Sequence, residues 1–572
     1  MARIKPEAAY EKMVVDGFGG IRYVSALTGD GASAMRNFRI APDGSLEKRC
    51  GMTTLYSLSG VIRGVWQGTL DGNNYLVVVA GNSVYVRIPN ASEPTVNYYL
   101  QTTEGPVCFA VVGGVLFLFD GDDIYRYLTS VNSFSLSEGY APLYGKDWHP
   151  TQLGSVNEPR NMISRRIRVR YLNSTGSTTI NLPFTTSSID HADVDGETFV
   201  DYSFTPETSV LHIPAARAHG VLTLAITIAS IFSQRSVIAH TDQGYVYRDA
   251  SHETLLLYGG QSGYRVYNSS PVTEEMLSES SAIYYSSDPL YFRSPCGFYI
   301  GDQQHPVHAL CRDRDRVLAL SDNAIWAIEY AGDDLVSYPM EGGVGCSTPS
   351  GVALCGNDPV VIHDSGIYKL QFPSARSDVC VPSALSDGVS ELFPASLFQN
   401  GILAWFPEHN ELWLRDPTES EEGLVWVLSF SRREWYCFNR IPATAFFEID
   451  GKIGFGTSDG RLVLPDNDAD TDDGTAISAY YQSHFLAFAH PENFKRAYRA
   501  TVCADTGGRS LSFTVRTDHE ERNFTMIAQA PGKPSFFDFR SASGRFRFLR
   551  YKIAVIGNVR TRIYRLSILA NP

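Results

Sequence analysis

Apolar and polar positions follow one pattern that recurs six times along this chain. A polar turn leads into a short apolar strand, a second polar turn follows, and then come an apolar position and usually an aromatic one. The aromatic positions of successive copies are 40, 201, 42, 45 and 50 residues apart, and Val463 takes this place in the last copy. The copies are Asp71–Val86, Gly113–Tyr127, Arg314–Ile328, Asn357–Leu370, Asn400–Leu414 and Asp450–Leu464, with aromatics at Tyr85, Tyr125, Trp326, Tyr368 and Trp413.

A strand repeat of about 40 to 50 residues is typical of the blades of a β-propeller. The run Val115–Phe119 is apolar at five consecutive positions. We therefore expect a strand that is buried on both faces, as neighbouring blades would bury it. Turns such as Gly121-Asp122 have the chemistry of hairpins. A series of unrelated hairpins in a large sandwich is the alternative, but the regular spacing, broken only once, favours about six propeller blades.

The segments around the repeat complete an all-β prediction. The chain has 572 residues, 44% of them apolar and 12% aromatic, and this turn-rich composition favours strands over helices. The long interval contains strands in which Arg166, Arg168 and Arg170 are expected to face water, which predicts an inserted β-sandwich-like domain. About seven short strands after residue 475 predict a C-terminal β-sandwich. The predicted divisions are N-terminal strands at 1–60, first blades at 61–140, the inserted domain at 141–304, remaining blades at 305–465, an acidic linker at 466–475 and the sandwich at 476–572.

Charge and cysteine content narrow the class of protein. The net charge of −14 argues against a protein that grips nucleic acid through a basic face. It suits a surface past which DNA slides, because a negative wall repels phosphate. The N-terminus lacks the apolar core of a signal peptide, and no run of 18 apolar residues occurs, so no membrane span is expected. The nine cysteines have no CxxC spacing, which predicts buried reduced thiols.

Catalytic and metal-binding motifs are nearly absent. The sequence has no Walker loop, HExxH or GxSxG motif, its blade turns lack the order found in sialidases, and no pair of carboxylates stands out as a glycosidase pair. We therefore expect a protein that is not an enzyme and needs no cofactor. Asp468, Asp470 and Asp472 have the first three EF-hand spacings, but the glycine falls at Gly474 and Ala479 replaces the final Glu. A solvated linker is therefore preferred over a calcium site.

Basic residues gather with aromatic ones near the C-terminus. Such a mixture is compatible with nucleic-acid binding. Because the whole chain is acidic, we prefer a face that docks another subunit or an acidic partner. The residues are Arg540, Arg545, Arg547, Arg550, Lys552, Arg560, Arg562 and Arg565.

Two stretches resemble structural proteins of bacteriophage virions. Asn37-Phe38-Arg39, followed by the run from Gly44 to Gly51, is similar to the opening of many virion proteins, in which an Asn-x-Arg strand precedes a Gly-x-Leu-x-Lys-Arg-x-Gly strand. The stretch from Ile477 to Val502 resembles the terminal domain of podovirus tail hub or nozzle proteins, which are similar to propellers with added β-domains. The strands at 163–240 match nothing in that family.

The resemblance implies a structural subunit of a ring, commonly a homo-hexamer, that lies below the portal and adaptor proteins of a phage tail. Such a ring would extend and seal the DNA channel and anchor tail fibres or spikes, while genomic DNA passes without specific binding. It would be part of the virion and would assemble in the bacterial cytoplasm. Two alternatives remain: a receptor-binding or glycan-degrading tail protein, and a cellular propeller that serves as an interaction platform. The absence of trimeric β-helix repeats disfavours a spike.

Overall fold

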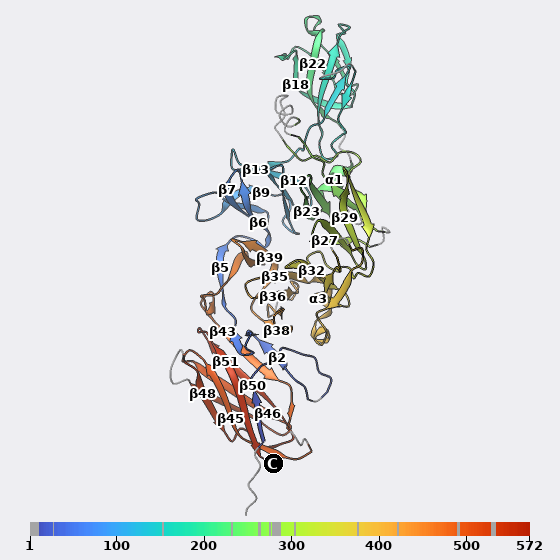
Figure 1. Cartoon of the computed structure of the whole chain (residues 1–572). Coiled ribbons are helices and arrows are strands. Elements are labelled where there is room, and N and C mark those ends of the chain that lie inside the picture. The colour runs from blue at the N-terminus through green and yellow to red at the C-terminus, as the bar shows by residue number, and fades with distance from the viewer. Residues whose placement is uncertain are drawn as a thin grey trace, which may run out of the picture.

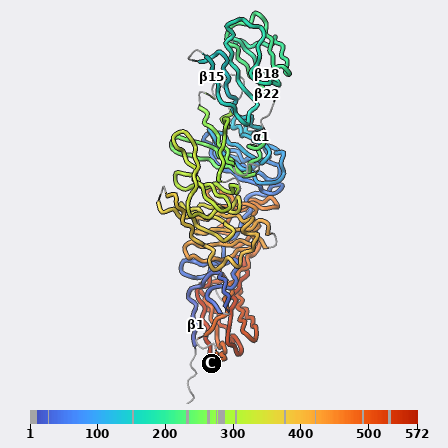
Figure 2. Tube along the Cα trace, turned by 90° about the vertical axis from the view of Figure 1, so that its right-hand side faces the viewer, coloured from blue at the N-terminus to red at the C-terminus, as the bar shows by residue number. Residues whose placement is uncertain are grey.

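The chain forms a β-propeller with one β-sandwich at each end, so that the molecule is elongated (Figure 1 and Figure 2). Strands make up 56% of it and helices 4%, which confirms the all-β prediction. Within the described part, none of the helices has the length and apolar character that a membrane crossing needs. The computed structural model describes residues 11–26, 28–150, 154–229, 233–260, 265–273, 276, 288–301, 305–374, 377–419, 422–488, 492–527 and 533–571.

Six of the blades are sheets of four strands that follow one another in the chain. Their strands are β6 (Ile62–Leu70), β7 (Asn73–Ala80), β8 (Ser83–Arg87) and β9 (Thr95–Tyr99); β10 (Cys108–Val112), β11 (Val115–Phe119), β12 (Ile124–Leu128) and β13 (Ser133–Leu136); β23 (Gln243–Arg248), β24 (Glu253–Tyr258), β25 (Arg265–Asn268) and β26 (Phe298–Tyr299); β27 (Val307–Asp313), β28 (Arg316–Ser321), β29 (Ile325–Ala331) and β30 (Asp334–Pro339); β31 (Val352–Cys355), β32 (Asp358–His363), β33 (Gly366–Gln371) and β34 (Val381–Ala384); β35 (Ile402–Phe406), β36 (Glu411–Arg415), β37 (Val425–Ser429) and β38 (Glu434–Phe438).

The seventh blade is completed by a strand from the other end of the chain. β39 (Ala443–Ile449), β40 (Lys452–Thr457) and β41 (Arg461–Asp466) form three of its strands, and β5 (Gly51–Ser57) pairs antiparallel with β41 as the fourth. The ring is closed, because every pair of neighbouring blades shares a buried apolar cluster. The shared clusters contain Val77 with Leu116, Phe117 with Leu255, Leu256 with Leu310, Leu318 with Val361, Val360 with Leu412, Trp413 with Phe455, and Leu462 with Leu76.

Strand β11 is buried on both faces, as its run of five apolar residues predicts. Leu116 and Leu118 join the cluster shared with the first blade, whereas Phe117 and Phe119 join the cluster shared with the third. All four side chains are fully buried. Alternate residues of β11 therefore pack against the first and the third blade. Each buried side chain contributes about 1.5–3 kcal/mol to stability.

The count of about six blades is low by one. The blade β23–β26 lies in the segment predicted as part of the insert, between residues 141 and 304. It repeats the pattern, with a strand at Glu253–Tyr258 and an aromatic at Tyr267, but its connection from β25 to β26 is longer than in the other blades. This connection and the inserted domain together break the spacing on which the prediction depends.

The inserted domain is therefore shorter than predicted. A six-stranded and a three-stranded sheet enclose a separate apolar core, and the short helix α1 (Ser233–Ala239) leads back to the propeller. Arg168 does not face water: it is fully buried and donates to the carbonyl of Ala141. Its strands are β14 (Leu143–Lys146), β15 (Val156–Asn157), β16 (Arg166–Asn173), β17 (Thr179–Asn181), β18 (Thr186–Val194), β19 (Glu197–Thr198), β20 (Ser203–Thr205), β21 (Val210–His212) and β22 (Gly220–Ile228), with the 3-10 turn η1 (Ala215–Arg217).

The C-terminal sandwich is built from both ends of the chain. One sheet has the order β3-β4-β51-β45-β48 with β1 and β49 attached, and the other contains β43-β50-β46-β47 with β2 and β44 attached. The N-terminal residues are thus strands of the sandwich. Its strands are β1 (Glu11–Val15), β2 (Ala32–Arg36), β3 (Phe38–Ile40), β4 (Leu46–Lys48), β43 (Thr475–Ser483), β44 (Leu486–Ala487), β45 (Lys495–Asp505), β46 (Ser510–Thr517), β47 (Glu521–Ile527), β48 (Ser535–Arg540), β49 (Arg545–Phe546), β50 (Phe548–Gly557) and β51 (Arg562–Asn571).

The predicted acidic linker is part of a continuous sheet. β42 (Thr471–Asp472) pairs with β5 of the propeller and with β43 of the sandwich, so that the seventh blade and one sandwich sheet form a single sheet of eleven strands. The remaining short elements are η3 (Ser390–Leu392) and α3 (Ala395–Asn400). All nine cysteines are free, and Cys296, Cys311, Cys346, Cys380 and Cys437 are buried.

Candidate functional site

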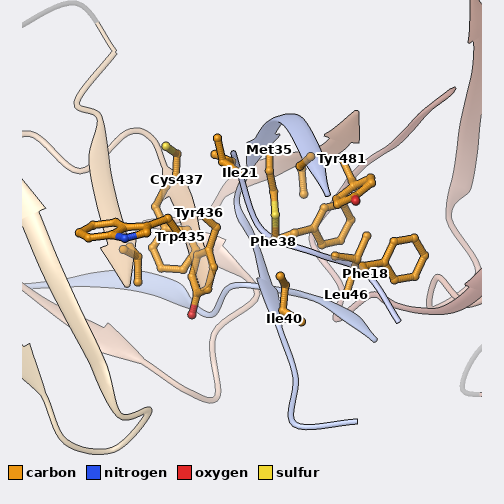
Figure 3. Packing of buried hydrophobic residues seen from close by; sticks show 14 of the residues in the cluster. Phe18, Ile21, Met35, Phe38, Ile40, Leu46, Trp435, Tyr436, Cys437 and Tyr481 are labelled. Atoms are coloured by element: carbon orange, nitrogen blue, oxygen red, sulfur yellow. The ribbon is translucent and has the colours of Figure 1, made fainter. Parts of the chain in front are cut away.

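The N-terminal segment fills the junction between the propeller and the C-terminal sandwich. Its backbone covers the outer edge of the sixth blade: the amide of Ile21 donates to the carbonyl of Trp435 at 2.7 Å, and the amide of Asn37 donates to that of Cys437 at 2.9 Å. Figure 3 shows Met35 and Phe38 of this segment between the β38 side chains and Tyr481 of β43. An edge strand that would otherwise be open is thereby paired.

Asn37 connects three elements at this junction. Its φ of 55° lies in the left-handed region, which asparagine tolerates better than most residues. The side-chain amide donates to Asn439 Oδ1 at 2.6 Å and to the Ser478 carbonyl at 2.7 Å. Its Oδ1 accepts from the amide of Asn439 and from Arg49 Nε, both at 3.0 Å. The buried amide therefore links the sixth blade, the sandwich and the segment itself.

Arg49 uses its whole guanidinium group in the same network. Nη1 and Nη2 donate to the two carboxylate oxygens of Asp472, each at 2.7 Å, and also to the carbonyls of Cys50 and Asn439. The side chain is fully buried. A planar fork that meets a carboxylate in this way fixes orientation as well as charge, which lysine could not do.

A second ion pair anchors the next strand to the propeller. Arg39 of β3 donates from Nε to one oxygen of Glu411 at 3.0 Å and from Nη2 to the other at 3.3 Å. Glu411 also accepts from Tyr436 Oη at 2.6 Å and from Trp413 Nε1 at 3.1 Å. Burial and the Glu411 carboxylate raise the pKa of Tyr436 well above its usual value. The phenol therefore stays protonated and keeps donating.

Lys48 is the fourth polar residue of the N-terminal motif, after Asn37, Arg39 and Arg49, that lies in the junction. It is almost fully buried, and Nζ donates to the carbonyl of Gly557 at 2.9 Å and to that of Asp470 at 3.4 Å. Burial lowers its pKa to about 8. The motif thus places four polar side chains inside the junction with their hydrogen bonds satisfied. Such a network specifies one arrangement of two domains rather than a site for substrate.

The three aspartates of the calcium hypothesis do not form one site. Asp472 is held by Arg49, whereas Asp468 and Asp470 lie 4.0 Å and 3.8 Å from Arg560. Across the described ranges, no group of three or more His, Cys, Asp or Glu side chains could hold a metal ion. The carboxylates of Asp468, Asp470, Asp472 and Asp473 instead lie beside arginines, and that of Asp466 accepts from Thr53.

The basic residues near the C-terminus are divided among several surfaces. Arg562 pairs with Asp43 at 2.7 Å and Arg565 with Asp16 at 2.8 Å, so these two hold the N-terminal segment. Arg547 lies over the ring of Phe494. Arg540 and Arg545 are exposed on the sheet that contains β45, and Arg550 and Lys552 lie on the other sheet. The sequence prediction of one basic cluster is therefore replaced by two opposite faces.

Several groups capable of acid–base chemistry are paired with one another or with arginines. His305 and His308 both contact Asp322, at 3.3 Å and 2.6 Å, a cluster that their separation from Asp322 in the sequence conceals. The cleft beside the junction has a volume of about 350 Å³ and contains three carboxylates. Each of these has an arginine within 4 Å: Glu422 has Arg36, Asp472 has Arg49 and Asp473 has Arg461.

Glu411 and Asn439 are the junction residues that sequence reasoning missed. They lie 372 and 402 residues from their partners Arg39 and Asn37. The sequence offers one signal for Glu411: it directly precedes the apolar run Leu412–Leu414, and a carboxylate buried with that run needs a cation.

The fold and this junction define a seven-bladed β-propeller protein with two added β-sandwiches. No family model and no curated protein matches the chain. Solved structures similar to it include a gluconolactonase from Xanthomonas campestris (12% identity, 81% of this chain and 99% of that chain, TM-score 0.29), the Pan2 WD40 domain of Neurospora crassa (8%, 74% and 96%, 0.25) and the mitotic checkpoint complex (10%, 77% and 98%, 0.31). These likenesses are too distant to bear on activity.

Proposed function

We propose that this protein is a structural component of a bacteriophage tail, a hub or nozzle subunit that assembles into a ring, commonly of six copies. The observation that carries the proposal is the junction. Asn37, Arg39, Lys48 and Arg49, through which the chain resembles the opening of many bacteriophage virion proteins, are the residues that lock the propeller to the sandwich. A subunit that bears load along a tail needs such a rigid connection.

The distribution of charge supports the same role. Residues 51–475, which form the propeller and the inserted domain, contain 25 Lys and Arg against 50 Asp and Glu. A ring whose channel is bounded by this part of the chain repels DNA phosphates and lets the genome pass without sticking. Adaptor or portal-proximal proteins would bind one end of the ring, and fibres or spikes would attach to its periphery. Its location would be the virion tail.

We propose further that the protein is not an enzyme. The buried carboxylate of Glu411 serves the junction, and those of Asp288 and Asp313 lie beside Arg126 and Arg316. The cleft carboxylates are held by arginines, and the histidines at 305 and 308 contact an aspartate. A glycosidase would need two carboxyl groups that converge on a substrate.

Electron microscopy tests the proposed function. The purified protein should form closed rings in negative stain, and gold-labelled copies should lie in the tail below the portal in intact particles. A matched preparation of the Arg49→Met variant should yield fewer or distorted rings at equal concentration. A monomer or trimer that depolymerises capsule or cell-wall glycan would support the receptor-binding or glycan-degrading alternative and contradict this one.

A further inference from the structure

A polar hollow of about 310 Å³ opens on the outer face of the sandwich sheet that contains β43, β50, β46 and β47. Figure 1 labels the first three of these strands. Arg550 of β50 lies directly opposite Arg516 of β46, and Lys552 lies opposite Thr514 and Gln482. Asn523 and Glu521 of β47 form the far side of the hollow. The hollow thus presents three cations and one carboxylate on a face formed by adjacent strands.

Among the described residues, the three cations are only partly neutralised, by the single carboxylate of Glu521, which lies opposite Arg516 on the neighbouring strand. Among the described residues, none of Arg516, Arg550 and Lys552 has a carboxylate oxygen within salt-bridge distance. Like charges directly opposite each other on antiparallel strands destabilise a sheet. The surface therefore carries an electrostatic cost that an anion placed between the two guanidinium groups would remove, and their forked donors suit a carboxylate.

Nucleic acid is a poor occupant for this hollow. Proteins that bind single strands offer aromatic rings on which bases stack. Here the ring of Phe485 is covered by Arg550, 5.1 Å from its centroid, and the ring of Tyr480 is covered by Lys552 at 4.2 Å. The acidic propeller and inserted domain also repel a polyanion of DNA length.

Charge separation within the molecule favours an acidic protein instead. Residues 1–50 and 476–572, which include all strands of the sandwich, contain 23 Lys and Arg against 12 Asp and Glu. A second copy would meet this face with like charge if the sandwiches paired. It would meet the face with its acidic part only in a head-to-tail contact, which either closes into a ring or extends into a filament. A different protein with clustered carboxylates fits the charge without this constraint on geometry.

We propose that the hollow formed by Arg516, Arg550 and Lys552 is a docking site for an acidic segment of a partner protein. Carboxylates of that segment accept from the two guanidinium groups, while the amides of Gln482 and Asn523 flank them. This proposal depends only on the geometry of one sandwich face, and it does not require that the protein form a ring.

Poly-L-glutamate is a suitable probe, because it carries carboxylates without other recognition chemistry. The full chain should bind it, and Arg516→Gln with Arg550→Gln should weaken binding by about tenfold or more, since both charge-assisted contacts are lost. The matched control is Arg540→Gln with Arg545→Gln, which removes the same charge from the opposite sheet and should change binding less than about twofold. Equal losses in the two double variants would overturn the proposal.

Two further measurements keep the test independent of folding and of other ligands. Arg516→Gln alone should raise the melting temperature at low salt, and the gain should vanish in high salt, because it comes from relieved repulsion; a lowered melting temperature would contradict this. A DNA oligonucleotide of equal charge that binds more tightly than poly-L-glutamate would overturn the choice of partner. So would loss of self-association in the double variant, measured by sedimentation, which would identify a second copy as the occupant.

Discussion

Buried charged and polar side chains at the junction specify how the propeller and the C-terminal sandwich are joined. Arg49 and Asp472 form a bidentate pair that is closed to solvent on the arginine side, and Asn37 is bonded to elements of both domains. Arg49 and Asn37 are removed from solvent, so each depends on its protein partners for hydrogen bonds. Removal of one partner leaves the other unpaired in the interior, which costs far more than the pair itself contributes.

The first prediction follows from that asymmetry. Arg49→Met should destabilise the protein by about 3–5 kcal/mol, because Asn37 loses its charged partner while it remains buried and Asp472, whose side chain is 15% exposed, loses its cation. Calorimetric melting of both proteins measures the effect. The control is Arg560→Met, which removes an exposed arginine near Asp468 and should cost less than about 1 kcal/mol. Similar decreases in the melting temperature of the two variants would show that the buried Arg49 contributes no more to stability than the exposed Arg560.

Thiol ionisation gives a second prediction. Burial raises the pKa of Cys346 and Cys437 to about 12 and that of Cys380 to about 11, from an ordinary value of 9.0. Above pH 9 the unfolded chain releases these protons while the folded chain retains them, so stability should fall as the pH rises from 9 to 12. Lys48 acts in the opposite sense above pH 8, since its pKa is lowered, but the thiols outnumber it.

Thermal melting between pH 7 and pH 11 measures this dependence. Cys437→Ala removes one contributing thiol and should flatten the alkaline loss, with Cys503→Ala, a partly exposed thiol on β45, as the control. A melting temperature that stays constant or increases up to pH 11 would contradict the assignment of buried thiols.

At the scale of elements, two-sided burial is what holds the ring together. Phe117 of β11 is fully buried in the cluster that joins the second and third blades, while its neighbours on the strand face the first blade. A carboxylate at this position would have no path to solvent, and Arg126, which lies opposite on β12, already pairs with Asp288. The strand cannot turn the side chain away, because both faces are occupied.

The third prediction concerns this strand. Phe117→Asp should prevent soluble expression, because a desolvated carboxylate in a doubly buried strand opens the apolar interface between the second and third blades. Phe536→Asp is the matched control, since Phe536 lies on β48 with 72% of its surface exposed and should tolerate the change. The soluble fraction of each variant after expression is the measurement. Normal folding of Phe117→Asp would contradict the blade assignment.

The elements that sequence reasoning found are those whose signal is local. The copy from Gly113 to Tyr127 could be recognised because its strands, turns and aromatic lie within 15 residues. The third blade was missed because the connection between β25 and β26 is long. β1 could not be assigned to the sandwich, since Glu11 pairs with Ala570, and a pairing at such separation leaves no periodic trace. Glu411 was missed for the same reason, because its partner Arg39 is distant in the sequence.

At the scale of the whole molecule, the apolar clusters divide the chain into unequal cooperative parts. One cluster runs from the fifth, sixth and seventh blades through the N-terminal segment into the C-terminal sandwich. The inserted domain at the opposite end has a cluster of its own. Domains that share a core are expected to unfold together, whereas a separate core can unfold independently.

The fourth prediction is therefore two calorimetric transitions. Leu224→Ala, at a fully buried position of the inserted domain, should lower only the smaller transition, by about 2–5 kcal/mol. Leu511→Ala, at a fully buried position of the sandwich, should lower only the larger one. A single transition that both variants shift would show that the inserted domain is not independent.

Strand pairing between the two ends of the chain also has a consequence for synthesis. β5 has no partner until β41 has been made, and β1 has none until β51 emerges, at the very end of translation. At elongation rates of about 5–20 residues per second, these N-terminal strands wait on the order of a minute beside the ribosome. Their short length and the charges among them, such as Lys12 and Arg39, would help the nascent chain to avoid premature pairing with its neighbours in a polysome.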